Sequence, residues 1–182
     1  TIAKREEIKL SDDGSRLLAL AAEGSMRDAE SIFGQVMAAG DREITRETVE
    51  NVLGLPRRES AKKMFEFVSN KDLRGSLALI QELSDAGHDL SYFGKLLLQY
   101  FRNALFLKTD PSLNSFVSAD LLPDEYECIV SNLPNLPMEE LSRGVNVIFD
   151  NLQHFKKASI PQLPLEITVI ELIRGAKNAN LV

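Results

Sequence analysis

The chain has 182 residues, of which 44% are hydrophobic and 26% charged, and its formal net charge at pH 7 is -6. A chain of this length can bury a substantial core and form one domain or two small ones, and we expect two. The negative charge argues against a protein that wraps nucleic acid through its own overall field, so any contact with DNA should be indirect.

Cysteine and histidine are too few and too scattered for a disulfide or a zinc site. Cys128 is the only cysteine, which fits a reducing cytoplasm, and we interpret it as a buried small hydrophobe. His88 and His154 lie in different segments, so we expect no metal site. No Ser-His-Asp arrangement or paired catalytic carboxylates stand out, and we assign no catalytic residue. No apolar run approaches the roughly 20 residues of a membrane span, so we expect no membrane contact.

The first 54 residues predict a compact helical unit. Residues 1–7 have helical composition without a cap and look like the cut end of a helix, so we expect that a preceding part of the protein lies upstream. Three helices follow, each with a good N-cap residue at its start and a glycine at its end. Their flanking residues are Ser11 and Gly24, Ser25 and Gly40, and Thr45 and Gly54.

The segment Gly24-Ser25-Met26-Arg27-Asp28-Ala29 places a cation where a helix disfavours one. Arg27 in the first turn meets the positive end of the helix dipole, at a cost of about 0.3–1 kcal/mol. It therefore needs compensation, which Asp28 could supply, or an anionic target. A guanidinium beside a helix N-terminus forms a phosphate-binding corner. From the spacing alone a solvated arginine is the favoured interpretation, because short matches produce many false positives.

Gly54-Leu55-Pro56-Arg57-Arg58 is the predicted domain boundary, because glycine and proline together stop one helix and delay the next. Beyond it, apolar stripes over 61–68 and 73–83 predict an antiparallel helical hairpin. Asp89 caps the next helix, over 90–107, which is apolar nearly all round. Either this helix is the centre of its own bundle, which we favour, or one side meets another subunit.

The remaining elements are also predicted to be helical. We expect a polar loop over 109–118, a short helix from 121 that breaks at 133–137, and a helix over 138–158 with a coiled-coil-like seam. After a proline-pinned link at 159–164, a last helix carries Leu165, Val169 and Leu172. Its β-branched run 167–170 would also suit a strand, but no second strand is predicted to pair with it.

Residues 18–29, followed by Thr45–Leu53 and Gly54-Leu55, resemble the helical lid of AAA+ clamp-loader ATPases. The match is closest to the gamma/tau subunits of bacterial DNA polymerase III. In that family the G-S-x-R-D-A segment is the sensor-2 motif, whose arginine faces the nucleotide phosphates. The resemblance therefore implies a lid domain over 1–54, in which Arg27 and Ser25 belong to an ATP-binding site.

Residues 55–182 resemble the collar domain of the same subunits, through 77–83, 93–108 and 161–166. The resemblance implies an all-α fold, with a small lid followed by a helical-bundle collar for oligomerisation. It implies a subunit that assembles the loader and couples ATP binding to loading the sliding clamp on primed DNA. Other loader subunits, the clamp and primed DNA would be its partners.

The same resemblance places ATP and Mg²⁺ in an ATPase core that precedes Thr1. The chain has no G-x-x-x-x-G-K-[ST] phosphate loop, so we expect it to be inert as an enzyme by itself. Two alternatives stay open: a helical scaffold that binds only proteins, and another clamp-loader-like AAA+ subunit. A phosphate loop upstream of Thr1 would exclude the scaffold.

Overall fold

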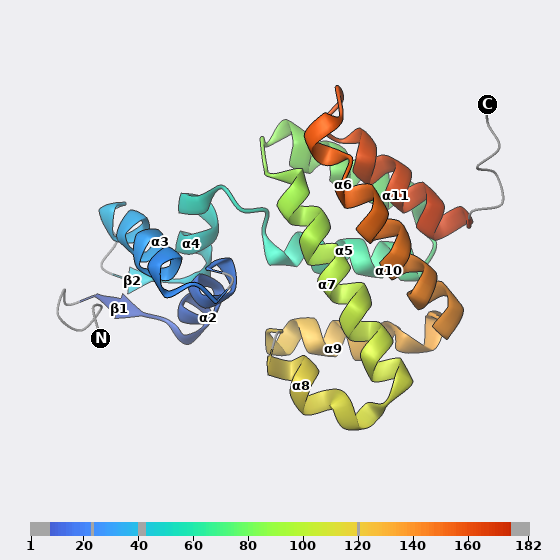
Figure 1. Ribbon diagram of the computed structural model, residues 1–182, viewed down its shortest axis with the longest axis horizontal. Coiled ribbons are helices and arrows are strands. Elements are labelled where there is room, and N and C mark those ends of the chain that lie inside the picture. The colour runs from blue at the N-terminus through green and yellow to red at the C-terminus, as the bar shows by residue number, and fades with distance from the viewer. Residues whose placement is uncertain (1–7, 23, 40–42, 120, 176–182) are drawn as a thin grey trace. The chain divides into compact units, whose positions relative to one another are not determined.

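The computed structural model (Figure 1) describes residues 8–22, 24–39, 43–119 and 121–175. The helical fragment expected over 1–7 lies outside these ranges. The chain divides into two compact units, Thr1–Arg57 and Arg58–Val182, each with its own apolar core. Within the described ranges, regular structure is helical except for one pair of two-residue strands, which confirms the all-α fold. No helix in these ranges is long and apolar enough to cross a membrane.

Unit 1, as far as it is described, consists of three helices and one short parallel strand pair (Figure 1). The three predicted N-caps are confirmed: the side chains of Ser11, Ser25 and Thr45 each accept a backbone N–H three residues further on. The strand pair was not predicted, because two residues give no periodic pattern. The elements are β1 (Lys9–Leu10), α2 (Asp12–Ala21), α3 (Met26–Ala38), β2 (Glu43–Ile44) and α4 (Arg46–Leu53).

Unit 2 is a helical bundle. Its helices, in chain order, are α5 (Arg58–Ser69), α6 (Leu73–Asp85), α7 (Leu90–Thr109), α8 (Asn114–Ala119), α9 (Pro123–Asn132), α10 (Met138–Leu152) and α11 (Leu163–Arg174). Three short 3-10 turns lie between them, η1 (Pro111–Leu113), η2 (Leu133–Asn135) and η3 (Phe155–Lys157).

Helix α7 is the centre of this bundle, as expected from its all-round apolar surface. It packs against α5, α8, α9 and α10, and α10 in turn packs against α11. Two glycines allow the close approach of α7 and α10. A Cβ on Gly144 would lie 2.5 Å from Cδ1 of Phe101, and one on Gly94 would lie 2.7 Å from Cδ2 of Leu152. The contact therefore depends on glycine at 144, where the Phe101 ring is buried, and less at 94, where the nearest atom is the end of a flexible leucine side chain.

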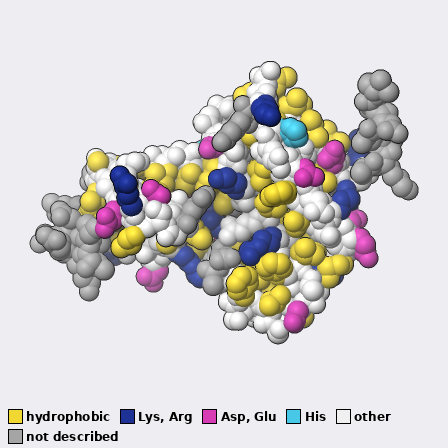
Figure 2. Space-filling model, in the orientation of Figure 1, with side chains coloured by type: hydrophobic (Ala, Val, Ile, Leu, Met, Phe, Trp, Pro, Cys, Tyr) yellow, Lys and Arg dark blue, Asp and Glu magenta, His cyan; other side chains and the backbone are white. Residues whose placement is uncertain are grey.

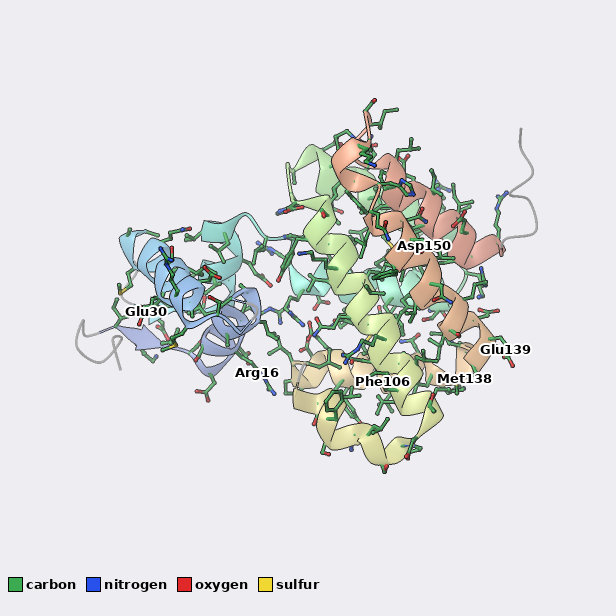
Figure 3. The ribbon with its side chains drawn as sticks, in the orientation of Figure 1. Arg16, Glu30, Phe106, Met138, Glu139 and Asp150 are labelled. Atoms are coloured by element: carbon green, nitrogen blue, oxygen red, sulfur yellow. The ribbon has the colours of Figure 1, made fainter. Side chains whose placement is uncertain are left out.

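The polar loop expected over 109–118 is wrong, because the chain forms η1 and then α8 there. Asp110 starts η1 by accepting the Ser112 N–H at 2.8 Å. The ring of Phe116 on α8 then lies 6.1 Å from the ring of Phe106 on α7, between ring centroids, and the guanidinium of Arg102 stacks over Phe106 at 4.6 Å. Figure 3 labels Phe106. These ring contacts and the fully buried Val117 hold α8 against the core, and local sequence could not reveal them because they depend on tertiary packing.

The helix expected over 138–158 is too long, because α10 ends at Leu152 and η3 follows. Phe155 continues the apolar seam from η3 and still packs against the core, so the seam outlasts the helix. The last predicted helix is confirmed as α11, despite its β-branched run. Its residues Leu165, Val169 and Leu172 are buried in the core of unit 2.

Candidate functional site

The N-terminus of α3 is the site that the sequence singled out. Gly24 adopts a left-handed backbone with φ of 83°, which reverses the chain between α2 and α3. Ser25 is extended, and its Oγ accepts the Asp28 N–H at 3.3 Å. The N–H groups of Met26 and Arg27 come too early in the helix for an intrahelical partner. The start of α3 therefore presents donors and positive potential to its surroundings.

Arg27 lies at the second position of α3 and is exposed, and Met26 before it is 74% exposed. Among the residues that the structure describes, none forms an ion pair or hydrogen bond with the Arg27 guanidinium. Asp28 follows Arg27 but forms no ion pair with it, so the compensation that Asp28 could supply is not a direct contact. The structure thus brings Ser25 and Arg27 to one exposed helix end, where the guanidinium can reach an anion.

Packing inside unit 1 fixes the direction of this helix end. Phe33 and Val36 on α3 are buried against Leu17 and Leu18 of α2, and Val49 of α4 completes the cluster. Because the first turn of α3 carries no buried side chain, its residues can change without disturbing this core. Arg27 therefore lies on a helix that is fixed by the core of unit 1, but its own side chain does not contribute to that core.

Unit 2 contains a buried ion pair that sequence analysis missed. Arg58, the first residue of α5, donates from Nε to Oε1 of Glu125 at 2.6 Å and from Nη2 to Oε2 at 2.9 Å. Both side chains are at most 2% exposed. Glu125 Oε2 also accepts the Leu122 N–H at 2.8 Å, which caps α9. A single carboxylate thus joins the start of α5 to the start of α9.

The electrostatics of this pair follow from its burial. Loss of water lowers the pKa of Arg58, but the hydrogen bond and charge of Glu125 outweigh that effect and raise it. Burial raises the pKa of the neighbouring Tyr100 hydroxyl far above its usual range, and the negative charge of Glu125 adds to the effect. Both residues therefore keep one protonation state at any physiological pH.

Cys128 is buried, as expected, and lies 3.5 Å from Oε1 of Glu66. Burial, with a contribution from Glu66, raises the pKa of its thiol to about 12. Its thiolate is therefore scarce at neutral pH, and the residue is a poor nucleophile.

Exposed apolar side chains gather at the C-terminal side of unit 2. Leu163, Ile167 and Ile170 form a stripe along α11 and are 40%, 40% and 39% exposed. Ile160, just before the helix, is 50% exposed. We call Ile160, Leu163, Ile167 and Ile170 the α11 stripe. A shallow groove of about 210 Å³ borders it, lined in part by Leu163, Pro164 and Ile167.

Helix α7 adds nothing to this exposed apolar surface. A contact of one of its sides with another subunit was the less favoured alternative, and its apolar side chains are buried or pack against the core of unit 2. On α10, Val147 packs against the core of unit 2, whereas Phe149 is 57% exposed. One mostly polar face of α10 carries Met138, Glu139 and Asp150, which Figure 3 labels. Figure 2 shows hydrophobic and charged side chains interspersed on the visible face of unit 2.

Comparison with known proteins divides the chain into two adjoining matches. Residues 1–42 match the family model of the DNA polymerase III clamp loader subunit ATPase lid domain, and residues 44–180 match that of DNA polymerase III subunits gamma and tau domain III. The second match includes α4, although α4 packs against α2 and α3 in unit 1. Packing therefore puts the boundary at Arg57, later than the family models do.

Individual relatives agree with these matches. The chain is similar to DNA polymerase III subunit tau of Bacillus subtilis, with 21% identity over 171 residues. The alignment covers 94% of this chain and 30% of the relative. It is 25% identical over 173 residues to DNA polymerase III subunit gamma/tau of Mycobacterium tuberculosis, again covering 94% of this chain and 30% of the relative. The chain thus spans about a third of the length of these relatives.

A solved structure shares the fold. The Bacillus subtilis DNA clamp loader delta protein superposes with a TM-score of 0.56 at 17% identity, over 94% of this chain and 53% of that protein. At this level of identity the likeness shows a common arrangement of helices and no more.

Proposed function

Because the chain belongs to the family of DNA polymerase III gamma and tau subunits, we propose that unit 1 is a nucleotide-sensing lid and unit 2 an assembly collar. The whole protein would couple ATP binding to loading the sliding clamp on primed DNA in the cytoplasm. The observation that carries the proposal is the exposed Arg27 at a capped helix N-terminus, inside a segment that matches a clamp-loader lid.

The residues at the start of α3 fit a phosphate group. Arg27 offers a charged fork of donors, and the first backbone N–H groups of α3 add positive potential beside it. ATP with Mg²⁺, held by an ATPase core elsewhere in the whole protein, supplies a terminal phosphate that ADP lacks. Arg27 would bind that phosphate and so hold the lid closed only in the ATP state, a difference between two states that a switch requires.

The described part of the chain offers too few contacts to bind ATP alone. One arginine and one helix end correspond to a Kd no better than about 1 mM. We expect calorimetry on the 182-residue chain to detect neither tight ATP binding nor hydrolysis. Micromolar binding would reveal a pocket within this chain and would contradict the division of labour proposed for the lid.

The decisive experiment replaces Arg27 in the whole protein. Loss of a charge-assisted contact worth about 1.5–3 kcal/mol should reduce ATP-dependent clamp loading by about 10- to 150-fold in Arg27→Ala. The chain supplies a matched control in Arg74, which is exposed at the second position of α6, behind the N-cap Asp72. Arg74→Ala should load normally. Equal losses in both variants would show that Arg27 has no special role.

For the collar, we propose that the α11 stripe contacts other loader subunits. Its side chains are too exposed to serve the core of unit 2, and contiguous exposed apolar surface usually marks a partner site. Light scattering of the chain, alone and mixed with other loader subunits, should show association that Ile167→Glu weakens. Val130→Glu on α9 is the matched control, because Val130 is 41% exposed and lies outside the stripe. A strictly monomeric chain in every mixture would exclude the collar role.

A further inference from the structure

Asn103 is a polar side chain enclosed in the core of unit 2 without a protein partner. It lies on α7 and is 0% exposed. Neither its Nδ2 nor its Oδ1 forms a hydrogen bond with any residue that the structure describes. A buried side-chain amide without hydrogen-bond partners destabilises the folded state. Native proteins rarely leave both its NH₂ group and its carbonyl oxygen without a hydrogen bond.

Tyr100 presents a second open polar group on the same side of α7. It precedes Asn103 by three residues, which places the two side chains about one helical turn apart. Its ring is fully buried and packs against Phe65, with ring centroids 5.6 Å apart. The hydroxyl lies close enough to Glu125 for the charge of that carboxylate and a weak hydrogen bond to it to raise the hydroxyl pKa, but no described residue makes a well-formed hydrogen bond with it.

The surroundings restrict what could satisfy these groups. No macromolecular partner can reach a side chain that is 0% exposed. Arg58 and Glu125 already neutralise each other through two hydrogen bonds, so neither charge requires a further ion. Arg58 would repel a cation near Tyr100, and Glu125 would repel an anion. Asn103 needs both an acceptor for its NH₂ and a donor for its carbonyl. A small, neutral group that donates and accepts is required, and water meets each condition.

We infer that the core of unit 2 holds an internal water molecule, bound by the Asn103 amide and the Tyr100 hydroxyl beside the Arg58–Glu125 ion pair. Such waters occur about once per 27 residues in globular proteins and typically make about three hydrogen bonds. Water here would complete a polar network between α7 and the starts of α5 and α9, three helices that pack against one another.

Replacement of Asn103 by leucine distinguishes a hydrated site from a dry one by the sign of its effect. If water is bound, Asn103→Leu removes its partners and lowers the folded-to-unfolded ratio, by about tenfold. If the site is dry, the same change removes an unsatisfied amide and raises the ratio, by about fivefold or more. Asn132→Leu is the control for the loss of a satisfied amide, because Asn132 is also buried but donates to the Cys128 carbonyl at 2.8 Å. It should lower the folded-to-unfolded ratio.

Magnetic resonance tests the water directly in the unmodified 182-residue chain. We expect a cross-relaxation peak between water and the Asn103 side-chain NH₂, and its loss in Asn103→Leu. This measurement decides the question even if the leucine variant does not fold. Absence of the peak in the unmodified chain, or a more stable Asn103→Leu, would overturn the inference.

Discussion

The buried pair of Arg58 and Glu125 should control the stability of unit 2 in a strongly non-additive way. Removal of either partner strands the other charge in a site that is at most 2% exposed. A stranded buried charge costs about 3–5 kcal/mol, a large share of the 5–15 kcal/mol that typically stabilises a domain. We therefore expect Arg58→Met and Glu125→Leu each to lower the free energy of unfolding by about that amount.

The double variant Arg58→Met/Glu125→Leu should be much closer to the unmodified chain. Apolar residues of similar volume in place of a buried pair are neutral or stabilise by about 1–4 kcal/mol. Against this, the Leu122 N–H loses its acceptor Glu125 Oε2 at a cost of about 1–3 kcal/mol. The two contributions nearly cancel. The double variant should therefore be more stable than either single variant.

Tyrosine fluorescence during urea unfolding measures this cycle selectively. The chain has no tryptophan, and its three tyrosines, Tyr92, Tyr100 and Tyr126, all belong to unit 2. The signal therefore reports unit 2 without interference from unit 1, which need not unfold in the same transition. If the losses in the two single variants simply add in the double variant, Arg58 and Glu125 are not energetically coupled.

Three further predictions concern packing and titration. Gly144→Ala should lower the free energy of unfolding by about 1–3 kcal/mol, because its Cβ would lie 2.5 Å from the Phe101 ring. Gly34→Ala, within α3 and with nothing within 4 Å of its Cβ, should instead raise it by about 0.5–1 kcal/mol, and denaturant unfolding measures both. Burial raises the pKa of the Cys128 thiol from 9.0 to about 12, so the unfolded thiol ionises first and stability, complete below pH 9, is lost as pH rises toward 12. Between pH 9.5 and 10.5, the Cys128 thiol should lower the free energy of unfolding of the unmodified chain by about 1.4 kcal/mol per pH unit. Cys128→Ala lacks this contribution, so its free energy of unfolding should fall less steeply over the same range.

Local signals in the sequence were sufficient wherever local physics decides the structure. The N-caps Ser11, Ser25 and Thr45 are confirmed because a cap depends on residues at most three positions away. Helix α8 was missed because the contacts of Phe116 and of the buried Val117 are made with other parts of the fold. The α11 stripe was missed because its residues share the apolar character of buried ones. Exposure depends on which neighbours cover a face, and one sequence does not specify that.

Arg27 and Arg58 show most clearly where local sequence stops being informative. Each lies in the first turn of a helix, and each is followed by an acidic residue, Asp28 or Glu59. The helix dipole disfavours both arginines equally. Their fates differ because Arg58 meets Glu125, 67 residues away, whereas Arg27 meets no described partner. An arginine in this position therefore signals only that an anion is needed, and the fold decides whether that anion is part of the chain or a ligand.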